Sequence, residues 1–534
     1  MKPQQQYLLK TFCSIILLGV ASWFFNTAKA QVPAIKCYFN HPVNNSISTG
    51  FNAVYLNNTF PDTIAAYISR AKFTIDVVMY NYTSTINSNV YKIAIAANAA
   101  AARGVAIRWI YNGTSATSNT GLSLLSPLIK TFASPNYSDY IMHNKFMLID
   151  VNGADSTNAI AQTGSYNWSD QQTTGDYNNI IFIQSKQVAL AYYNEFNKMW
   201  GGVSASPNPV LSTFSTFKTP SSQTQFNVNG TLIEVYFSPK DSLGKHLQNN
   251  ISTANFDLFF GIYTFTDNTI ANLIKTTYNN GIYVRGIMDN FSMPFAAYSI
   301  LNPALGSNMI TYSGSGLYHN KIMLIDALNP ASDPQVFTGS FNWTAQARES
   351  NDENAVVIHD AAIANQYYQS LCKNFTDFGG TPCVTPPCPG ANITLISNVR
   401  GSSYQWQLDT GSGFINITDN SFYTGSNTVN LTLMNAPSIW YGYQYRCLVD
   451  GASLSDTTNL HFTAYWNGSV SNAWETPANW NCGTLPDANT DVIINSGVHF
   501  FPVINTSTAC RSVRLNKQTI VTLINGVNLI LNGR

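Results

Sequence analysis

Apolar and polar positions along residues 35–376 alternate between two kinds of run. Residues 73–80 and 105–111 are short apolar runs rich in β-branched and aromatic side chains, which predict buried strands. Residues 90–102 and 186–200 are longer runs that predict helices, and each is followed within two residues by a glycine that can end a helix. Strands that alternate with helices in this way favour a layered α/β fold.

One stretch of this pattern occurs twice. Residues 143–150 read H-N-K-F-M-L-I-D, and residues 319–326 read H-N-K-I-M-L-I-D. Each copy is followed by a second shared block, G-S-Y-N-W-S at residues 164–169 and G-S-F-N-W-T at residues 339–344. The two histidines lie 176 residues apart and the two Gly-Ser pairs lie 175 apart, so the chain contains an internal duplication.

The duplication predicts two similar lobes. We expect the first at residues 31–200 and the second at residues 231–376, joined by a Ser/Thr/Pro-rich linker at residues 201–230. The lobes should pack in a pseudo-two-fold arrangement, so that both His-Lys strands face one cleft.

Side chains on a strand point alternately to opposite faces, so the first and third residues of each copy share a face. These are His143 and Lys145 in the first copy, with Asn144 on the other face, and His319 and Lys321 in the second. An imidazole beside an ammonium group is costly in a core, which favours a functional site. Histidine serves as nucleophile or as acid and base near neutral pH, and lysine is a donor suited to phosphate oxygens.

The Gly-Ser blocks add neutral polar groups to the same candidate site. Ser165 with Asn167, and Ser340 with Asn342, alternate onto one face of their strands. We expect these side chains to act as neutral donors to an oxyanion.

The motif H-x-K-x4-D followed by G-S-x-N, present twice, resembles the phospholipase D superfamily. The resemblance covers roughly residues 35 to 375, and the flanks agree, since residues 71–80 parallel residues 254–263. It implies two α/β/α sandwich lobes and a metal-free, two-step cleavage of a phosphodiester, with no cofactor. One histidine attacks phosphorus and forms a phosphohistidine. The other protonates the leaving oxygen and then activates water or an alcohol.

The resemblance also implies roles for the remaining motif residues. Both lysines and both asparagines of the blocks would neutralise charge on the equatorial phosphate oxygens. The motif aspartates, Asp150 and Asp326, are mostly structural in this family and are placed in a supporting role. A duplicated scaffold can lose its activity, but every motif His, Lys, Ser and Asn is present in both copies here.

The two repeats differ at one position that bears on which histidine attacks. Ten residues past each Gly-Ser block, Glu353 in the second repeat aligns with Asn178 in the first. In relatives an acidic residue here orients the histidine of the opposite repeat. We therefore expect Glu353 to pair with His143 as nucleophile, and His319 beside neutral Asn178 to be the acid. Asp176 is a candidate to compensate for the acid missing at Asn178.

The N-terminal residues 1–30 have the features of a secretory signal peptide. Lys2 and Lys10 precede an apolar run at residues 11–25, and Ala28-Lys29-Ala30 is a small-x-small cleavage site. The run is short for a membrane span, so a retained anchor is the less favoured alternative, and no later segment has the apolar length to cross a bilayer. We expect a secreted protein, extracellular, at the cell surface or periplasmic.

Charge limits the choice of partners. Removing Lys2, Lys10 and Lys29 leaves 24 basic residues against 27 acidic ones, and charged residues are only 10% of the chain. The net charge therefore does not indicate a strongly basic surface that attracts nucleic acid. A local basic groove would not show in the net charge.

The character of the sequence changes after a Gly/Pro-rich boundary at residues 377–387. Residues 388–463 carry the Cys388, Trp406 and Tyr445-x-Cys447 layout of an immunoglobulin-like sandwich, which implies a Cys388–Cys447 disulfide with Trp406 packed on it. Residues 464–534 resemble a β-repeat module of bacterial surface proteins and stop in mid-pattern. For this all-β region we favour a spacer or adhesion role over a specific binding role.

The other cysteines can form disulfides in an oxidising compartment. We expect Cys372 with Cys383 and Cys482 with Cys510, which leaves Cys37 over. The cysteines and histidines do not have zinc spacing, so no metal site is expected.

Three functions remain open from the sequence. The leading one is a secreted phospholipase D-type phosphodiesterase that hydrolyses phospholipid head groups, with possible membrane-surface contact. The alternative within enzymes is an endonuclease of the same superfamily. The alternative of another class is an inactive surface adhesin. Because one chain holds both motifs, a monomer is sufficient for catalysis, and the preference for water over an alcohol is open.

Overall fold

The computed structural model describes most of the chain after residue 33. The described residues are 34–49, 51–114, 116–153, 157–280, 282–328, 332–380, 383, 387–397, 399, 401–455, 457–494, 498–515 and 519–533. The expected signal peptide at residues 1–30 lies outside them. Among the helices of the described part, none has both the length and the apolar character needed to span a membrane.

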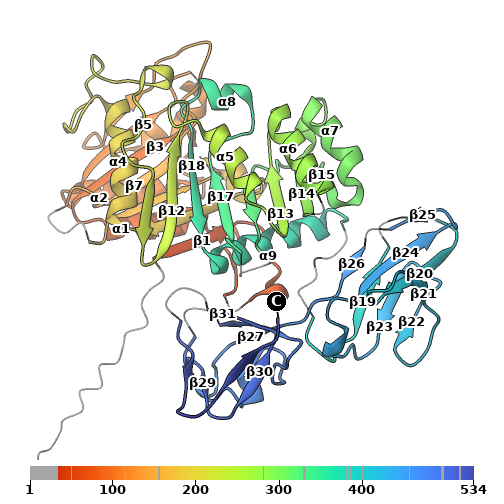
Figure 1. Cartoon of the computed structure of the whole chain (residues 1–534). Helices are drawn as coiled ribbons and strands as arrows, with labels where there is room; N and C mark the ends of the chain where they lie inside the picture. The colour runs from red at the N-terminus through yellow and green to blue at the C-terminus, as the bar shows by residue number, and fades with distance from the viewer. Residues whose placement is uncertain are drawn as a thin grey trace, which may run out of the picture. The chain divides into compact units, whose positions relative to one another are not determined.

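The first lobe is built on an eight-stranded mixed sheet (Figure 1). Its strands, in their order across the sheet, are β2 (Val54–Tyr55), β1 (Ile35–Phe39), β10 (Asn179–Gln184), β8 (Ile160–Gly164), β7 (Lys145–Ile149), β3 (Thr74–Met79), β5 (Ala106–Tyr111) and β6 (Lys130–Ala133). The first His-Lys stretch runs into β7, which pairs antiparallel with β3 and β8 near the middle of the sheet.

The second lobe repeats this sheet. Its strands, in the same sense, are β11 (Gln225–Val228), β12 (Thr231–Phe237), β18 (Asn354–His359), β17 (Gln335–Gly339), β16 (Lys321–Ile325), β13 (Asp257–Ile262), β14 (Tyr283–Asp289) and β15 (Met309–Tyr312). β16, which carries the second His-Lys stretch, pairs antiparallel with β13 and β17, as β7 does with β3 and β8. The α/β fold class expected from the duplication is confirmed.

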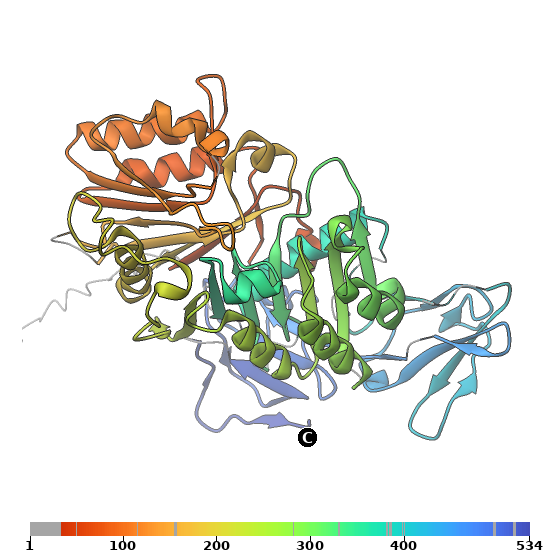
Figure 2. The same cartoon turned by 90° about the horizontal axis from the view of Figure 1, so that it is seen from above.

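Helices cover the outer face of each sheet. In the first lobe α1 (Phe60–Arg70) and α2 (Tyr91–Ala102) bury an apolar face against β3 and β5, and Figure 2 shows both (orange) on that side of the sheet. In the second lobe the matching cover is α5 (Leu243–Ser252), α6 (Asn268–Asn279) and α7 (Ala296–Leu305). The shorter elements of the two lobes are β4 (Tyr82–Thr83), β9 (Trp168–Ser169), α3 (Asp170–Thr174) and α8 (Ala345–Glu349).

Two long helices lie between the sheets and join the lobes. α4 (Lys186–Trp200) packs on β8 and β10 of its own sheet and on β12 of the other, while α9 (Ala361–Asp377) packs on β16 and β17 and also on β1. The side chains around them form one hydrophobic core that includes Ile181, Phe196, Val235, Val356 and Tyr367. Each central helix therefore contributes to burying both sheets.

The ends of α4 show how the local sequence sets the boundaries. Ser185 caps the first turn by accepting a hydrogen bond from the backbone N–H of Val188, and Gly201 ends the helix at φ 82°, a left-handed conformation that favours glycine. The helix expected at residues 186–200 is confirmed, and the strands expected at residues 73–80 and 105–111 are found at Thr74–Met79 and Ala106–Tyr111.

The segment between the lobes, residues 201–230, is more than a connection. Its β11 adds to the second sheet by pairing with β12, and its Lys218 is fully buried. The Lys218 ammonium lies 2.5 Å from the Glu195 carboxylate on α4 and 2.7 Å from the Asp352 carboxylate, and it donates to the carbonyl of Ser238. Burial lowers the Lys218 pKa, but these two carboxylates outweigh burial and raise it above its ordinary value.

We expect Lys218→Met to destabilise the protein by about 3–5 kcal/mol, because it leaves two carboxylates buried without their cation. Chemical denaturation of the purified variant measures this loss. Lys240→Met, which changes an exposed lysine just after β12, is the matched control and should stay within about 0.5 kcal/mol of the parent. Equal stability of the two variants would contradict a structural role for Lys218.

The C-terminal region is all β, as expected. Its first part has one sheet in the order β19 (Ile393–Ile396), β23 (Asn430–Leu433) and β22 (Tyr423–Thr424), and a second in the order β21 (Ile415–Asn416), β20 (Tyr404–Asp409), β24 (Gln444–Val449) and β25 (Ser453–Leu454), with β26 (Thr458–Asn459) also paired to β24. Trp406 and Tyr445 are buried in its core. The immunoglobulin-like identity of this part stays a prediction.

The Cys388–Cys447 disulfide predicted for this part is wrong. Cys388 is bonded to Cys482, and Cys447 is a buried free thiol beside Trp406. The reason is the path of the chain, because the backbone N–H of Thr463 bonds to the carbonyl of Pro387, which puts Cys388 at the last module. Cys510 is also a free buried thiol, so its predicted pairing with Cys482 is wrong as well.

The remaining cysteine predictions hold. Cys372 and Cys383 form a disulfide that ties the end of α9 to the boundary segment, with their Cα atoms 5.7 Å apart. Cys37 is a free, buried thiol that donates to the side-chain oxygen of Gln366.

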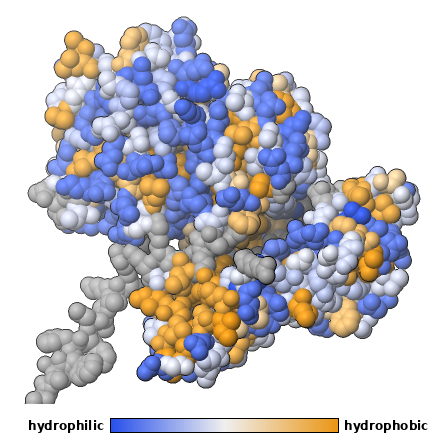
Figure 3. All heavy atoms as spheres, viewed as in Figure 1, coloured by the Kyte–Doolittle hydropathy of each residue, from blue (hydrophilic) through white to orange (hydrophobic). Residues whose placement is uncertain are grey.

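The last module is a stack of parallel strands. β27 (Thr463–Trp466), β28 (Asp491–Ile494) and β31 (Ser512–Leu515) pair in parallel, and so do β29 (Val503–Ile504) with β32 (Thr522–Leu523) and β30 (Thr508–Cys510) with β33 (Leu529–Leu531). Figure 3 shows apolar residues gathered on this module, where Phe500, Leu523, Ile524, Ile530 and Leu531 are exposed. This parallel stacking was not expected from the sequence.

Candidate active site

The two His-Lys stretches meet where the lobes join. Met142 forms a parallel β-bridge with Asp352 of the other lobe, and the backbone N–H of His143 donates to the carbonyl of Asp352 over 2.9 Å. On the other side, the N–H of Tyr177 donates to the carbonyl of Leu317 over 2.8 Å. The backbone therefore links each motif to the segment that precedes the last strand of the opposite sheet.

The middle residue of each H-N-K stretch strengthens this junction. The side-chain oxygen of Asn144 accepts from the amide of Asn354 over 3.0 Å, and that of Asn320 accepts from the amide of Asn179 over 2.9 Å. The two bonds are equivalent under the pseudo-two-fold relation of the lobes. Asn179 and Asn354 were missed in the sequence, although both follow the aligned pair of Asn178 and Glu353 directly.

His143 is held by a carboxylate from the other lobe. Its Nδ1 lies 2.8 Å from Glu353 Oε2, which also accepts a hydrogen bond of 2.6 Å from the Ser340 hydroxyl, and the Asn351 amide donates to the other oxygen. Burial raises the pKa of Glu353, but the neighbouring His143 and its hydrogen bond bring the pKa below its ordinary value. The expected contact between Glu353 and His143 is present.

His319 has a neutral partner in the same place. Its Nδ1 lies 3.0 Å from Asn178 Oδ1, which accepts 2.9 Å from the Ser165 hydroxyl. The amide of Asn178 donates to the carbonyls of Gln172 and Asp176, so its oxygen is the atom that faces the imidazole. The Asp176 carboxylate accepts instead from Leu317 N–H and the side chain of Gln171, so it does not substitute for an acid at Asn178.

The serines of the Gly-Ser blocks do not have the role expected for them. A hydroxyl has one proton to donate. Ser340 gives its proton to Glu353 and Ser165 gives its proton to Asn178, while both oxygens accept a backbone N–H from the following strand. Their hydroxyls therefore orient the partners of the histidines and are not free to bind an oxyanion.

The two motif lysines are fully buried beside the histidines. Each ammonium donates to the carbonyl of the histidine two residues before it, Lys145 over 2.9 Å and Lys321 over 2.7 Å. Each also lies over a tyrosine ring, 5.1 Å from the centroid for Tyr80 and 5.2 Å for Tyr263. These rings also lie against the imidazoles of His143 and His319.

The two histidines and the two lysines of the motifs are buried close together, which changes the pKa of each. Burial lowers the pKa of Lys145 to about 7, and burial together with the charge of Lys145 lowers that of Lys321 well below its ordinary value. Burial lowers the pKa of His143 to about 4 despite Glu353, and His319 is also lowered, first by burial and then by both lysines. The backbone links between the lobes place both motifs in one site, where the Glu353 carboxylate offsets only part of the effect of burial and of the two lysines.

The remaining motif residues fall into two places. Asn167 is buried near its Gly-Ser block, with its side-chain oxygen unpaired among the described residues, and Asn342 Oδ1 accepts from Thr264 N–H. Asp150 and Asp326 lie at the far ends of β7 and β16 from the histidines. Each carboxylate binds consecutive backbone N–H groups of the neighbouring segment, at residues 72–74 and 255–257, which fits the supporting role expected for them.

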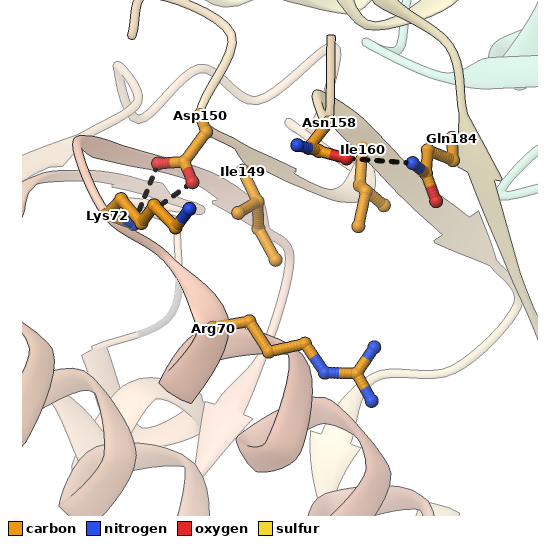
Figure 4. Close-up of a pocket in the computed structure, with 7 residues that line it drawn as sticks. All are labelled: Arg70, Lys72, Ile149, Asp150, Asn158, Ile160 and Gln184. Atoms are coloured by element: carbon orange, nitrogen blue, oxygen red, sulfur yellow. Dashed lines mark hydrogen bonds between the residues drawn. The ribbon is translucent and has the colours of Figure 1, made fainter. Parts of the chain in front are cut away.

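A pocket of about 220 Å³ lies at that far end and is separate from the histidine site. Figure 4 shows Ile149 and Asp150, from the end of β7, on one side of it and Arg70 and Gln184 on others. Asp150 is already used by the backbone N–H of Lys72, so it does not face the pocket as a free acid.

A second group of titratable side chains lies in the second lobe, at the end of β18. His359 has a carboxylate on each ring nitrogen, Glu234 at 3.0 Å and Asp333 at 2.9 Å. Burial lowers the pKa of His359, but the two carboxylates outweigh burial and raise it from 6.5 to about 9.

We expect this group to make stability depend on pH. A raised folded-state pKa means that the stabilisation is complete below about pH 6.5 and is lost as the pH rises through about 9. Asp333 is more than half exposed, so we expect a loss of about 1 kcal/mol over that window. Denaturation at pH 6 and pH 9.5 measures it, and His359→Gln should remove the difference. An unchanged pH slope in that variant would contradict the assignment.

Comparison with known proteins gives matches in the duplicated part of the chain. The family model described as "Cardiolipin synthase, PLD-like domain" matches residues 64–200 and 247–374. A phospholipase D of Rickettsia bellii is 29% identical over 143 residues, which cover 26% of this chain and 66% of that protein. A mitochondrial cardiolipin hydrolase of Xenopus tropicalis is 31% identical over 119 residues, 22% of this chain and 53% of that protein. This chain therefore spans slightly less than two thirds of the length of the first relative and about half of the length of the second.

Solved structures show weaker overall similarity. A phosphatidylserine synthase of Haemophilus influenzae superposes with a TM-score of 0.44 at 14% identity and covers 58% of this chain and 83% of that one. A phospholipase D family member, Nuc, of Salmonella typhimurium gives a TM-score of 0.24 at 24% identity, over 28% of this chain and 93% of that one.

Proposed function

Because this chain belongs to the phospholipase D superfamily, we propose that it is a phosphodiesterase that hydrolyses phospholipid head groups through a phosphohistidine. The observation that supports this best is the unequal pair of histidines around two buried lysines. The Glu353 carboxylate contacts one imidazole and the neutral Asn178 amide contacts the other, beside two lysines whose pKa burial lowers. The names of the relatives, phospholipase D and cardiolipin hydrolase, favour a lipid substrate.

In the proposed first step His143 is the nucleophile. The Glu353 carboxylate accepts the Nδ1 proton, which leaves the lone pair of Nε2 free to attack phosphorus. The lowered pKa keeps this imidazole neutral before attack. As the ring gains positive charge in the phosphohistidine, the carboxylate 2.8 Å away stabilises it.

His319 is the acid of the first step and the base of the second. Asn178 Oδ1 accepts the Nδ1 proton and holds the ring with Nε2 toward the leaving oxygen. The phosphorus–oxygen bond breaks as the leaving oxygen takes the Nε2 proton. In the second step the same nitrogen takes a proton from water, the resulting hydroxide attacks phosphorus, and His143 leaves.

Binding of a phosphodiester changes the balance of charge in the site. A phosphodiester carries a negative charge that offsets the repulsion between Lys145 and Lys321, so its binding raises the pKa of both lysines and of His319. His319 therefore gains its proton when substrate is present. Lys145 and Lys321 then balance the charge that develops on the equatorial oxygens.

A substrate panel tests the proposal with the full chain. We expect release of choline or ethanolamine from phospholipid vesicles, in the presence of EDTA, and little nicking of plasmid DNA. Nicking without head-group release would replace the lipid substrate by a nucleic acid. Loss of all activity in EDTA would contradict a metal-independent mechanism, and a lack of activity on both substrates would favour the adhesin.

Secretion is part of the proposal. Its support is the signal-like sequence at residues 1–30 together with two disulfides, Cys372–Cys383 and Cys388–Cys482, which persist in an oxidising compartment. N-terminal sequencing of the exported protein should begin near Gln31. Recovery of the uncleaved chain in the cytoplasm would contradict it.

A further inference from the structure

One loop beside the active site exposes large apolar side chains. It consists of residues 290–295, between β14 and α7, and we call it the 290s loop. Phe291 is 51% exposed and Met293 is 45% exposed. Large apolar side chains exposed close together, here on either side of buried Ser292, indicate an interaction site more often than isolated ones do.

The 290s loop is fixed to the catalytic histidine's surroundings. The Phe291 ring stacks on Tyr263 at 5.4 Å between centroids, and Tyr263 lies 5.3 Å from the His319 ring and over the Lys321 ammonium. The apolar side chain therefore lies one ring away from the proposed acid.

Buried polar groups hold the loop in this position. The hydroxyl of fully buried Ser292 donates to the carbonyl of Tyr263 and accepts from the N–H of Phe265. Asp289 accepts from the N–H of Phe291 and from the N–H of Tyr318, directly before the proposed acid. These bonds present Phe291 and Met293 outward from a rigid base.

The duplication supplies an internal comparison. The equivalent stretch of the first lobe follows β5, and residues 112–120 read N-G-T-S-A-T-S-N-T, where the 290s loop reads N-F-S-M-P-F. Asn112 accepts from Met142 N–H as Asp289 accepts from Tyr318 N–H, so the anchor is shared. Because the first lobe has a polar sequence at the equivalent place, the shared anchor does not require apolar residues after it.

The charge of the region selects the kind of partner. Residues 290–318 contain no Asp, Glu, Lys or Arg. A surface that binds a nucleic acid needs cations for its phosphates, and this stretch has none. Aromatic and apolar side chains without charge are instead suited to the boundary between head groups and acyl chains.

We propose that the 290s loop docks on a bilayer of zwitterionic phospholipid, with Phe291 and Met293 entering the head-group and acyl boundary beside the active site. This inference rests on the proposed lipid phosphodiesterase function and adds the surface by which the substrate is reached. Docking places a head-group phosphate next to the lysines while the acyl chains stay in the membrane.

Tryptophan substitution tests docking without requiring turnover. Phe291→Trp keeps an aromatic ring, and Phe256→Trp is the matched control, because Phe256 is 53% exposed at the opposite end of β13 from Tyr263. We expect phosphatidylcholine vesicles with brominated acyl chains to quench Phe291→Trp more than the parent, whose own tryptophans set the background. Phe256→Trp should match the parent. Equal quenching in both variants, or no extra quenching at position 291, would overturn the proposal.

A second variant measures the contribution of the loop to binding. Phe291→Ser combined with Met293→Ser should lower partition onto phosphatidylcholine vesicles, measured by sedimentation, by about tenfold or more. Phe256→Ser should leave partition unchanged. If single-stranded DNA, and not vesicles, changes the emission of Phe291→Trp, the loop stacks on bases and the membrane proposal fails. Quenching without head-group release would retain docking and reject the proposed function.

Discussion

His143→Ala should abolish phosphoenzyme formation and lower turnover by about 10⁴-fold or more, because it removes the proposed nucleophile. The assignment comes from the carboxylate of Glu353, which lies 2.8 Å from Nδ1 of His143, whereas Nδ1 of His319 faces the neutral amide oxygen of Asn178. Rapid quenching with a labelled phosphodiester and detection of acid-labile phosphohistidine measures the intermediate directly.

His319→Ala separates the two roles. An ester with a good leaving group, such as a p-nitrophenyl phosphodiester, does not need a proton on its leaving oxygen. His319→Ala should therefore still form the phosphohistidine from this substrate and stop before the second step, which needs a base. His499→Ala, an exposed histidine of the last module, is the control and should behave as the parent. If the intermediate forms in His143→Ala and not in His319→Ala, the two assignments are reversed.

Lys145→Met and Lys321→Met should each lower kcat by about 10²–10³-fold, since each removes a buried cation from the charge that develops on the phosphate. The thermal stability of the same variants should not fall with the activity, and it should equal or exceed that of the parent. Both ammonium groups are fully buried, and each lowers the pKa of groups in the other motif, so removing one relieves desolvation and repulsion in the free protein.

Thermal unfolding measured alongside kcat tests this opposition. We expect the melting temperature of each variant to equal or exceed that of the parent while activity falls. The difference should disappear when phosphate is bound, because the anion stabilises only the parent pair of lysines. A lower melting temperature in both variants would show that the lysines support the fold, and normal turnover would reject their role in the transition state.

The parts of the fold that depend on local pattern could be predicted from the sequence. The helix at residues 186–200 was found with its expected ends because Ser185 and Gly201 act within one turn of them. The contact of Glu353 with His143 followed from aligning the two repeats, although their catalytic roles stay predictions.

Features that depend on distant segments could not be predicted in the same way. Lys218 is buried against two carboxylates, one on α4 and one just before β18, and its neighbours in the sequence do not indicate either contact. The acceptors of the hydroxyl protons in the two Gly-Ser blocks are Asn178 and Glu353, and only the folded structure shows that these residues lie beside the serines. The partner of Cys388 depends on where Pro387 meets Thr463, and sequence spacing does not determine disulfide connectivity.

The central helices have a consequence for how the two halves can vary. Since α4 and α9 each bury part of both sheets, one half without the other would expose a large apolar face and would have to associate with a second copy. Two identical copies would give both imidazoles the same neighbour. A single polypeptide that contains both halves does not have that constraint. One half can carry a carboxylate beside the imidazole of the other while its counterpart carries an amide, so the two histidines can differ in their chemistry.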